Sequence, residues 1–483
     1  MKNLTLLVKE LIKLDAEYPC VEFKQNNSDP QMIGEYISAL SNTAAIEDKS
    51  KAYVLWGIDN DTHEIVGTEF NYRTKKGEGN EDLEPWLRRL LSDNANFEFE
   101  EVKIDNKNVV ILIIYKAIGK TVFFKNVEYI RVGSHKKKLK DNPGSEAKLW
   151  QKINNSRFEE LPAEEDMSLQ DVLNELDYVT YFDMSGIAVP AEGNQIAHYL
   201  LEDKIILYQD NGLYTISNLG ALLFAKKLDK YPALDRKRIR VIQYEDDKRI
   251  NILRQDTGGK GYASGFEGLV KYIAGLLPAK DEIEAPLRKE KTVYPIVAIR
   301  ELIANALIHQ DLSITGAGPT IEIFKSRIEI TNPGTPLVNI NRIIDNPPRS
   351  RNEIMASLMR RLGICEELGT GWDRVATYCE TYLLPAPQID IYEENTKVTV
   401  FGPIAYKNMT QETRLWTCYL HACLKYVNQE KATNSTLRDR LGLASTAAAS
   451  ASRLINLAVE AELIKPLDPN TAPRYKSYIP FWA

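Results

Sequence analysis

The stretch YVLWGID at residues 53–59 has the composition of a buried β-strand that ends at a turn. Its aromatic and branched residues favour a strand, and the acidic and polar residues that follow favour a turn. The sequence VEFK at 21–24 predicts a second strand, and the apolar spacing within 32–45 predicts an amphipathic helix between the two. Further strands are predicted at 97–102, 109–116 and 123–133, with a helix at 83–92. Residues 1–145 are therefore predicted to form an α+β module.

Length and composition place this module in a larger protein. A chain of 483 residues predicts two to four domains, and its 44% hydrophobic content is ordinary for folded proteins. The longest apolar run, at 109–115, is too short for a membrane span, and the first residues lack a signal-peptide pattern. Five cysteines without metal-site spacing favour a reducing cytoplasm. The net charge of −6 means that any contact with nucleic acid must come from local basic patches.

Four landmarks in the first module carry a family resemblance. These are Glu-Phe-Lys at 22–24, Ser-Asn-Thr at 41–43, Gly-Ile-Asp at 57–59 and YIRVGS at 129–134. In this order and spacing they resemble the Schlafen AlbA-type domain. The resemblance implies a nucleic-acid-binding module, with RNA or DNA as the partner.

Acidic residues in the same module suggest a metal site. Pro19 separates Glu17, at a helix end, from Glu22 on the following strand, and Asp59 ends the neighbouring strand. Three converging carboxylates could hold Mg²⁺ or Mn²⁺, which would activate water against a phosphodiester. Lys24 shares a strand face with Glu22 and could stabilise the phosphate. Glu17, Glu22 and Asp59 also resemble the acidic trio of Schlafen ribonucleases; the alternative is a set of exposed acids in a module that only binds.

A second group of residues predicts a nucleotide site. Glu301 and Asn305 lie one turn apart on a predicted helix from Pro295 to about His309. Asn332 and Gly334 follow a predicted strand, and Gly369 and Gly371 form a later glycine turn that can approach phosphates. In this order the residues resemble a GHKL-type ATPase, and residues 298–375 resemble the RecG-like C-terminal domain. The resemblance implies ATP and a magnesium ion held by Asn305, with Glu301 acting on water.

One position departs from the GHKL pattern. Asn332 stands where the family has an aspartate that accepts from the adenine amino group. An amide oxygen can accept the same hydrogen bond without charge. The alternative is a domain that has lost its nucleotide and serves as a scaffold or dimer interface.

The remaining segments complete an α+β multidomain prediction. We expect an AlbA-type domain at 1–145, a connector with a winged-helix-like hairpin at 146–290, a GHKL-like α/β sandwich at 291–408 and a C-terminal winged helix at 409–483. The expected recognition helix spans 445–461, and the alternative for this domain is a protein–protein contact. The residues predicted to contact nucleic acid are basic: Arg131, Lys136, Lys137, Lys138, Lys140 and Arg453.

These predictions support three functional hypotheses. The first is an ATP-responsive nucleic-acid-binding protein, with a candidate metal-dependent endoribonuclease acting on transfer RNA or structured RNA in stress or phage defence. The second is a non-catalytic transcriptional regulator that binds DNA through its winged helices. The third is a scaffold with inactive ancestral sites. A homo-oligomer is compatible with each.

Overall fold

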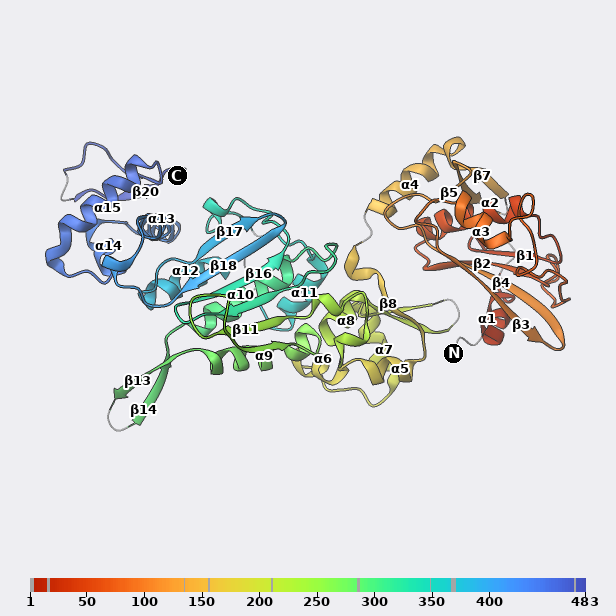
Figure 1. The fold of residues 1–483 in the computed structure, drawn as a ribbon, viewed down its shortest axis with the longest axis horizontal. Helices are drawn as coiled ribbons and strands as arrows, with labels where there is room; N and C mark the ends of the chain where they lie inside the picture. The colour runs from red at the N-terminus through yellow and green to blue at the C-terminus, as the bar shows by residue number, and fades with distance from the viewer. Residues whose placement is uncertain are drawn as a thin grey trace. The chain divides into compact units, whose positions relative to one another are not determined.

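The computed structural model describes residues 4–14, 18–133, 135–154, 157–209, 212–284, 287–347, 349–365, 371–472 and 475–483. The chain divides into two compact units, one made of residues 1–161 with 208–214, the other of 162–207 with 215–483 (Figure 1). Within the described residues, no helix has the length and apolar character needed to cross a membrane. The five cysteines are free thiols.

The first unit is built on a four-stranded sheet in the order β1-β2-β4-β3. Its strands are β1 (Val21–Lys24), β2 (Lys51–Trp56), β4 (Lys107–Tyr115) and β3 (Phe97–Ile104). Strands β1 and β2 are parallel, and the other pairs are antiparallel. All six residues of β2 are buried, because apolar clusters cover both faces of the sheet. This double burial explains the nearly continuous apolar run at 53–58.

Helix α2 (Pro30–Ile46) joins this sheet to a small second sheet. The second sheet contains β5 (Phe123–Phe124), β6 (Val127–Val132) and β7 (His135–Lys138). Asn42 donates to the carbonyls of Val122 and Tyr129 and accepts from the amide of Val122. Ser38 and Thr43 accept from the amides of Tyr129 and Arg131. The polar landmark at 41–43 thus belongs to a stripe that holds the second sheet on the helix.

Three further helices complete the first unit: α1 (Leu4–Leu11), α3 (Leu83–Leu90) and α4 (Pro143–Asn154). Val8 and Leu11 of α1 pack on the face of the sheet opposite α2. Leu149 and Ile153 of α4 are buried in the same core as α2. The domain therefore extends past the predicted boundary at 145, because α4 closes its core.

The second unit begins with the connector. Its sheet has the order β8-β10-β9, with β8 (Pro162–Met167), β10 (Tyr214–Ser217) and β9 (Ile206–Tyr208). Its helices are α5 (Leu169–Glu175), α6 (Tyr178–Ser185), α7 (Gly193–Glu202) and α8 (Asn218–Phe224). Strands β9 and β10 are neighbours, which confirms the hairpin predicted in the connector. Residues 210–211, which belong to the sequence predicted to turn at 210–212, lie outside the described residues.

A six-stranded mixed sheet with the order β12-β11-β15-β16-β18-β17 forms the centre of the second unit (Figure 1). Its strands are β12 (Ile252–Thr257), β11 (Arg240–Tyr244), β15 (Thr320–Ile323), β16 (Arg327–Pro333), β18 (Asn395–Phe401) and β17 (Gln388–Tyr392). Its helices are α9 (Tyr262–Leu276), α10 (Ile296–His309), α11 (Glu353–Arg361) and α12 (Gly371–Thr381). Strand β11 runs parallel to β15, so residues assigned by sequence to the connector belong to this sheet.

Two smaller parts complete the unit. A hairpin of β13 (Ala279–Glu284) and β14 (Leu287–Thr292) precedes α10. The C-terminal domain contains α13 (Gln411–Val427), α14 (Asn434–Arg440), α15 (Ala448–Glu460), β19 (Ile464–Pro466) and β20 (Tyr478–Pro480). Three helices followed by an antiparallel hairpin have the element order of a winged helix.

Candidate functional site

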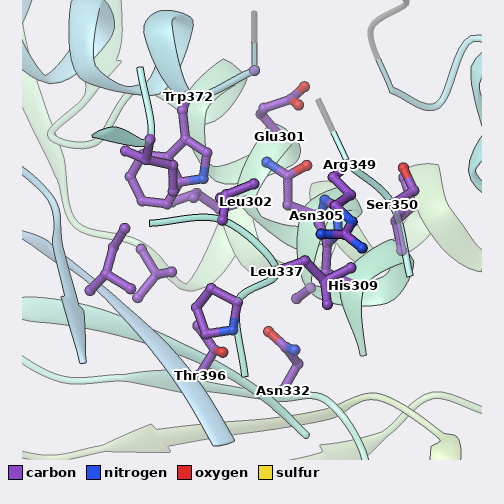
Figure 2. Close-up of a pocket in the computed structure, with 18 of the residues that line it drawn as sticks. Glu301, Leu302, Asn305, His309, Asn332, Leu337, Arg349, Ser350, Trp372 and Thr396 are labelled. Atoms are coloured by element: carbon purple, nitrogen blue, oxygen red, sulfur yellow. The ribbon is translucent and has the colours of Figure 1, made fainter. Parts of the chain in front are cut away.

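One face of helix α10 carries the polar residues of a pocket. Glu301, Asn305 and His309 are spaced one turn apart and line it, whereas the other residues from 302 to 308 are buried. A helix that is buried all round except for one polar stripe exposes that stripe to whatever fills the pocket. The predicted Glu301–Asn305 relationship is therefore present, and both side chains line the same cavity (Figure 2).

Glu301 has an unusual electrostatic environment. Burial raises the pKa of its carboxyl group, and the nearby Arg374 and a hydrogen bond with Asn305 oppose that rise. Helix α12 begins beside it, because a Cβ atom at Gly371 would lie 2.2 Å from Glu301 Oε1. Any larger residue at 371 would require the Glu301 side chain to move. Gly369, the other predicted glycine, lies outside the described residues.

The opposite end of the pocket is formed by the sheet. Asn332 of β16 is buried, and its amide nitrogen donates to the Pro333 carbonyl at 3.0 Å. This bond orients the side chain and leaves the amide oxygen as the acceptor for a ligand. Gly334 follows with a φ of +103°, a conformation that favours glycine. Figure 2 shows Asn332 and Thr396 at the end away from Glu301 and Trp372.

Thr396 was not predicted. It lies opposite Asn332 in the β16–β18 register, lines the pocket, and donates to the Gly334 carbonyl at 2.6 Å. The alternation in NTKVTVF at 395–401 places Thr396, Val398 and Val400 on one face and could have indicated a strand. This alternation does not show which strand lies beside 395–401. The pairing with β16 is what places Thr396 opposite Asn332.

The walls between the two ends are largely apolar, with cations on one side. Residues within 335–347 and 349–350, Arg349 among them, form one wall of the pocket, and Arg360 of α11 also lines it. His309 adds no charge near neutral pH, because burial lowers its pKa to about 4, with a smaller effect from Arg351. The apolar lining residues come from α10, the sheet and the loop: Leu302, Ala306, Ile330, Ile389, Val398, Leu337, Val338 and Ile343.

These features fit a purine nucleotide. Apolar walls with an acceptor at one end suit a base that carries an amino group, and the arginines suit phosphates. The residues that would hold the nucleotide are Asn332 at the base and Gly371 with the arginines at the phosphates. Asn305 offers an amide oxygen, the kind of ligand that Mg²⁺ accepts. The pocket residues are therefore compatible with an adenine nucleotide.

The acidic site predicted in the first unit has a different arrangement. Glu22 is buried and accepts from the Tyr36 hydroxyl at 2.8 Å, from Lys24 at 2.5 Å and from Arg131 at 3.0 Å. Two cations and a hydroxyl thus already surround the carboxylate. Lys24 contacts Glu22, in keeping with their shared strand face. Their ion pair leaves little negative charge for a metal.

The Asp59 carboxylate is hydrogen-bonded within its own turn. Its carboxylate accepts from the amides of Asp61 and Thr62 and from the Thr62 hydroxyl, and these bonds lower its pKa. Glu17 lies outside the described residues. Among the residues that are described, no three His, Cys, Asp or Glu side chains come together as a metal site. Glu22 and Asp59 therefore have separate structural partners.

The predicted nucleic-acid residues divide into two groups. Arg131 is buried, pairs with Glu22 and donates to the carbonyls of Val21 and Gly133, so it acts inside the fold and not at the surface as expected. Lys136 pairs with Glu35 and lies over the Tyr36 ring. The side chains that face solvent are Lys137, Lys138 and Lys140, at β7 and just after it, and Arg453 on α15.

Comparison with known families agrees with both parts of this description. Residues 17–140 match the family described as "Schlafen, AlbA_2". This segment is a Schlafen AlbA_2 domain. Residues 316–400 match the family described as "Putative ATP-dependent DNA helicase recG C-terminal", so this segment is a RecG-like C-terminal domain. The second match covers Asn332 and Thr396 but begins after Glu301 and Asn305.

The curated proteins and the solved structures give no further assignment for the chain. No curated protein matches the chain. A solved structure of the DIP2311 protein from Corynebacterium diphtheriae is similar at 16% identity and a TM-score of 0.43, covering 99% of this chain and 96% of that one. The AlbA_2 and RecG-like domains mark the chain as ATP-associated and nucleic-acid-related.

Proposed function

We propose that this chain is an ATP-responsive nucleic-acid-binding protein. The observation that carries the proposal is the convergence of Glu301, Asn305 and Asn332 on one pocket whose other walls are apolar. The AlbA_2 domain supplies the exposed lysines that would contact phosphates. Nucleotide and nucleic acid would thus bind to different parts of one chain.

The pocket residues have separable roles. Asn332 would accept from the amino group of adenine, since its nitrogen is held by Pro333. Asn305 would bind the magnesium ion, which when bound neutralises phosphate charge. Glu301 can accept a proton from water, and the rise in its pKa brings it closer to neutral pH. Binding requires the two asparagines, and turnover would additionally require Glu301.

Calorimetric titration with Mg-ATP tests the pocket directly. Wild-type protein should bind, Asn305→Ala should lose most of the affinity, and Glu301→Gln should retain binding but lose any hydrolysis. Asn408→Ala, an exposed asparagine of the same unit that is not among the pocket residues, is a matched control. Equal affinity for wild type and Asn305→Ala would refute the assignment.

A metal-dependent endoribonuclease is a second candidate. It is favoured by the match to residues 17–140, a segment that contains Glu17, Glu22 and Asp59. The cations around Glu22 weigh against it. The test is cleavage of transfer RNA in Mg²⁺ or Mn²⁺ by wild type, Glu22→Gln and Asp59→Asn. Loss of cleavage in both variants at an unchanged melting temperature would establish the acids as a site, while equal cleavage would exclude them.

The transcriptional-regulator and scaffold hypotheses make other predictions. A regulator would bind duplex DNA in preference to RNA, with Arg453→Ala weakening the binding. A scaffold would bind neither ATP nor nucleic acid. The same binding experiments therefore distinguish all three hypotheses.

A further inference from the structure

The C-terminal domain contacts two of the elements that line the nucleotide pocket. One is the segment from 335 to 347, and the other is helix α12, whose first residues, Gly371 and Trp372, line the pocket. Both contacts lie within the second compact unit.

The first contact is made by an aromatic pair, Tyr419 on α13 and Trp482 near the chain end. The Tyr419 hydroxyl donates to the Asn341 carbonyl and accepts from Trp482 Nε1 at 3.0 Å. The Arg342 guanidinium lies 4.6 Å from the centre of the Trp482 ring system. We call this group of Asn341, Arg342, Tyr419 and Trp482 the aromatic clasp.

The loop segment held by the aromatic clasp also forms the pocket wall. Ile343 lines the pocket and packs against the core of the C-terminal domain, and Asn346 lines the pocket three residues later. Ile344, between them, is 8% exposed and belongs to that core. The same short segment therefore forms part of the nucleotide wall and part of the contact with the C-terminal domain.

The second contact holds the far end of α12. Glu380 accepts from His421 Nδ1 at 2.9 Å and pairs with Arg440 at 3.5 Å. Arg440 is buried and also donates to the Leu384 carbonyl at 2.7 Å. Buried charged groups that are hydrogen-bonded in this way are costly to separate, so α12 and the C-terminal domain form a firm contact.

We infer that nucleotide binding and the position of the C-terminal domain are coupled through the aromatic clasp. The inference rests on the proposed ATP site. A nucleotide that contacts Ile343 and Asn346 would shift or order the segment on which Tyr419 and Trp482 rest. Thermodynamic linkage makes the coupling reciprocal, so a ligand of the C-terminal domain changes the affinity for ATP by the same factor.

Two clasp variants test the inference through ATP affinity. Tyr419→Phe removes only the hydroxyl that joins Asn341 to Trp482, and Arg342→Ala removes the cation from the ring. Each should weaken Mg-ATP binding several-fold while leaving the unfolding temperature of the chain close to wild type. Tyr475→Phe is the matched control, because it removes a hydroxyl from an exposed tyrosine of the same domain that is not a member of the clasp.

A second readout detects the coupling itself. Trp372 lines the pocket, so its emission would report ATP directly, and it is therefore kept in both proteins that are compared. The difference in emission between wild type and Trp482→Phe, each saturated with Mg-ATP or free of it, isolates Trp482. Addition of Mg-ATP should change this difference, and Asn305→Ala should abolish the change.

The outcomes separate the two proposals. Weaker ATP binding in both clasp variants together with a Trp482 response supports the coupling. ATP binding that is unchanged in the variants, or weakened without a Trp482 response, overturns the coupling and leaves the nucleotide site intact. Absence of ATP binding to the wild type refutes the proposed function, and the coupling falls with it.

Discussion

Asn332 on β16 lies directly opposite Thr396 on β18, and both side chains line the same pocket. Asn332 donates to Pro333, while Thr396 donates to Gly334. One amide hydrogen of Asn332 and the hydroxyl hydrogen of Thr396 are thus used within the protein, and the acceptor oxygen of Asn332 is available for the ligand. An asparagine held in this way can replace the charged aspartate of the GHKL pattern.

The first prediction concerns base selectivity. Asn332→Leu removes the acceptor but keeps a similar side-chain volume, so ATP affinity should fall roughly tenfold, the value of one good hydrogen bond. GTP has no amino group at that ring position. The wild type and Asn332→Leu should therefore bind GTP with the same affinity. Competition against a fluorescent nucleotide measures the ratio. An unchanged ATP-to-GTP ratio would contradict the role of Asn332.

The second prediction concerns the buried ion pair of the first unit. Arg131→Met leaves Glu22 buried without its closest guanidinium and should cost about 3–5 kcal/mol of stability. Arg88→Met, in the exposed pair with Glu84, should cost under about 1 kcal/mol. Chemical denaturation measures both. Similar small losses for the two variants would show that the Glu22–Arg131 pair has no structural importance.

The third prediction concerns the exposed lysines. Lys137→Glu with Lys138→Glu should weaken nucleic-acid binding and reduce the slope of log K against log salt by about 2. The control is Lys103→Glu with Lys120→Glu, which reverses the same number of exposed charges elsewhere in the unit. Salt titrations by fluorescence anisotropy provide the slopes. If both double variants behave alike, β7 is not the binding surface.

The fourth prediction concerns pH. Burial raises the pKa of Asp373, in the first turn of α12, to about 6, compared with 3.8 when exposed. The folded state therefore takes up the proton more readily, and ionisation of Asp373 lowers stability as pH rises from about 4 to about 6. Asp373→Asn should raise the melting temperature at pH 7.5 and have little effect at pH 3.5. Melting curves at the two pH values measure the difference, and equal shifts at both would contradict it.

Local patterns predicted some parts of the molecule well. The spacing of Glu301 and Asn305 fixes their common face on any helix, and the alternation at 21–24 fixes the contact between Glu22 and Lys24. The polar residues after Asp59 correctly indicate a turn, but the metal-binding role predicted for Asp59 overlooks the hydrogen bonds that its carboxylate accepts from that turn. Each of these relationships spans only a few residues.

Relationships between distant segments could not be predicted. Glu22 and Arg131 are far apart in the sequence, and their pairing depends on how α2 places β6 beside β1. The parallel pairing of β11 with β15 also joins distant segments. It places β11, which lies in the predicted connector, in the sheet of the nucleotide domain. Tyr419, Trp482 and Arg342 have no local pattern that relates them to a nucleotide pocket.

The most direct test of the central claim is the affinity of the full chain for nucleic acid with and without Mg-ATP. Fluorescence anisotropy with labelled transfer RNA and with a labelled DNA duplex would be measured in wild type and in Asn305→Ala at one fixed salt concentration. The proposal predicts that Mg-ATP changes the wild-type affinity for at least one of them several-fold and leaves Asn305→Ala unaffected. Affinities that are identical with and without Mg-ATP, in a wild-type protein that binds both ligands, would contradict it.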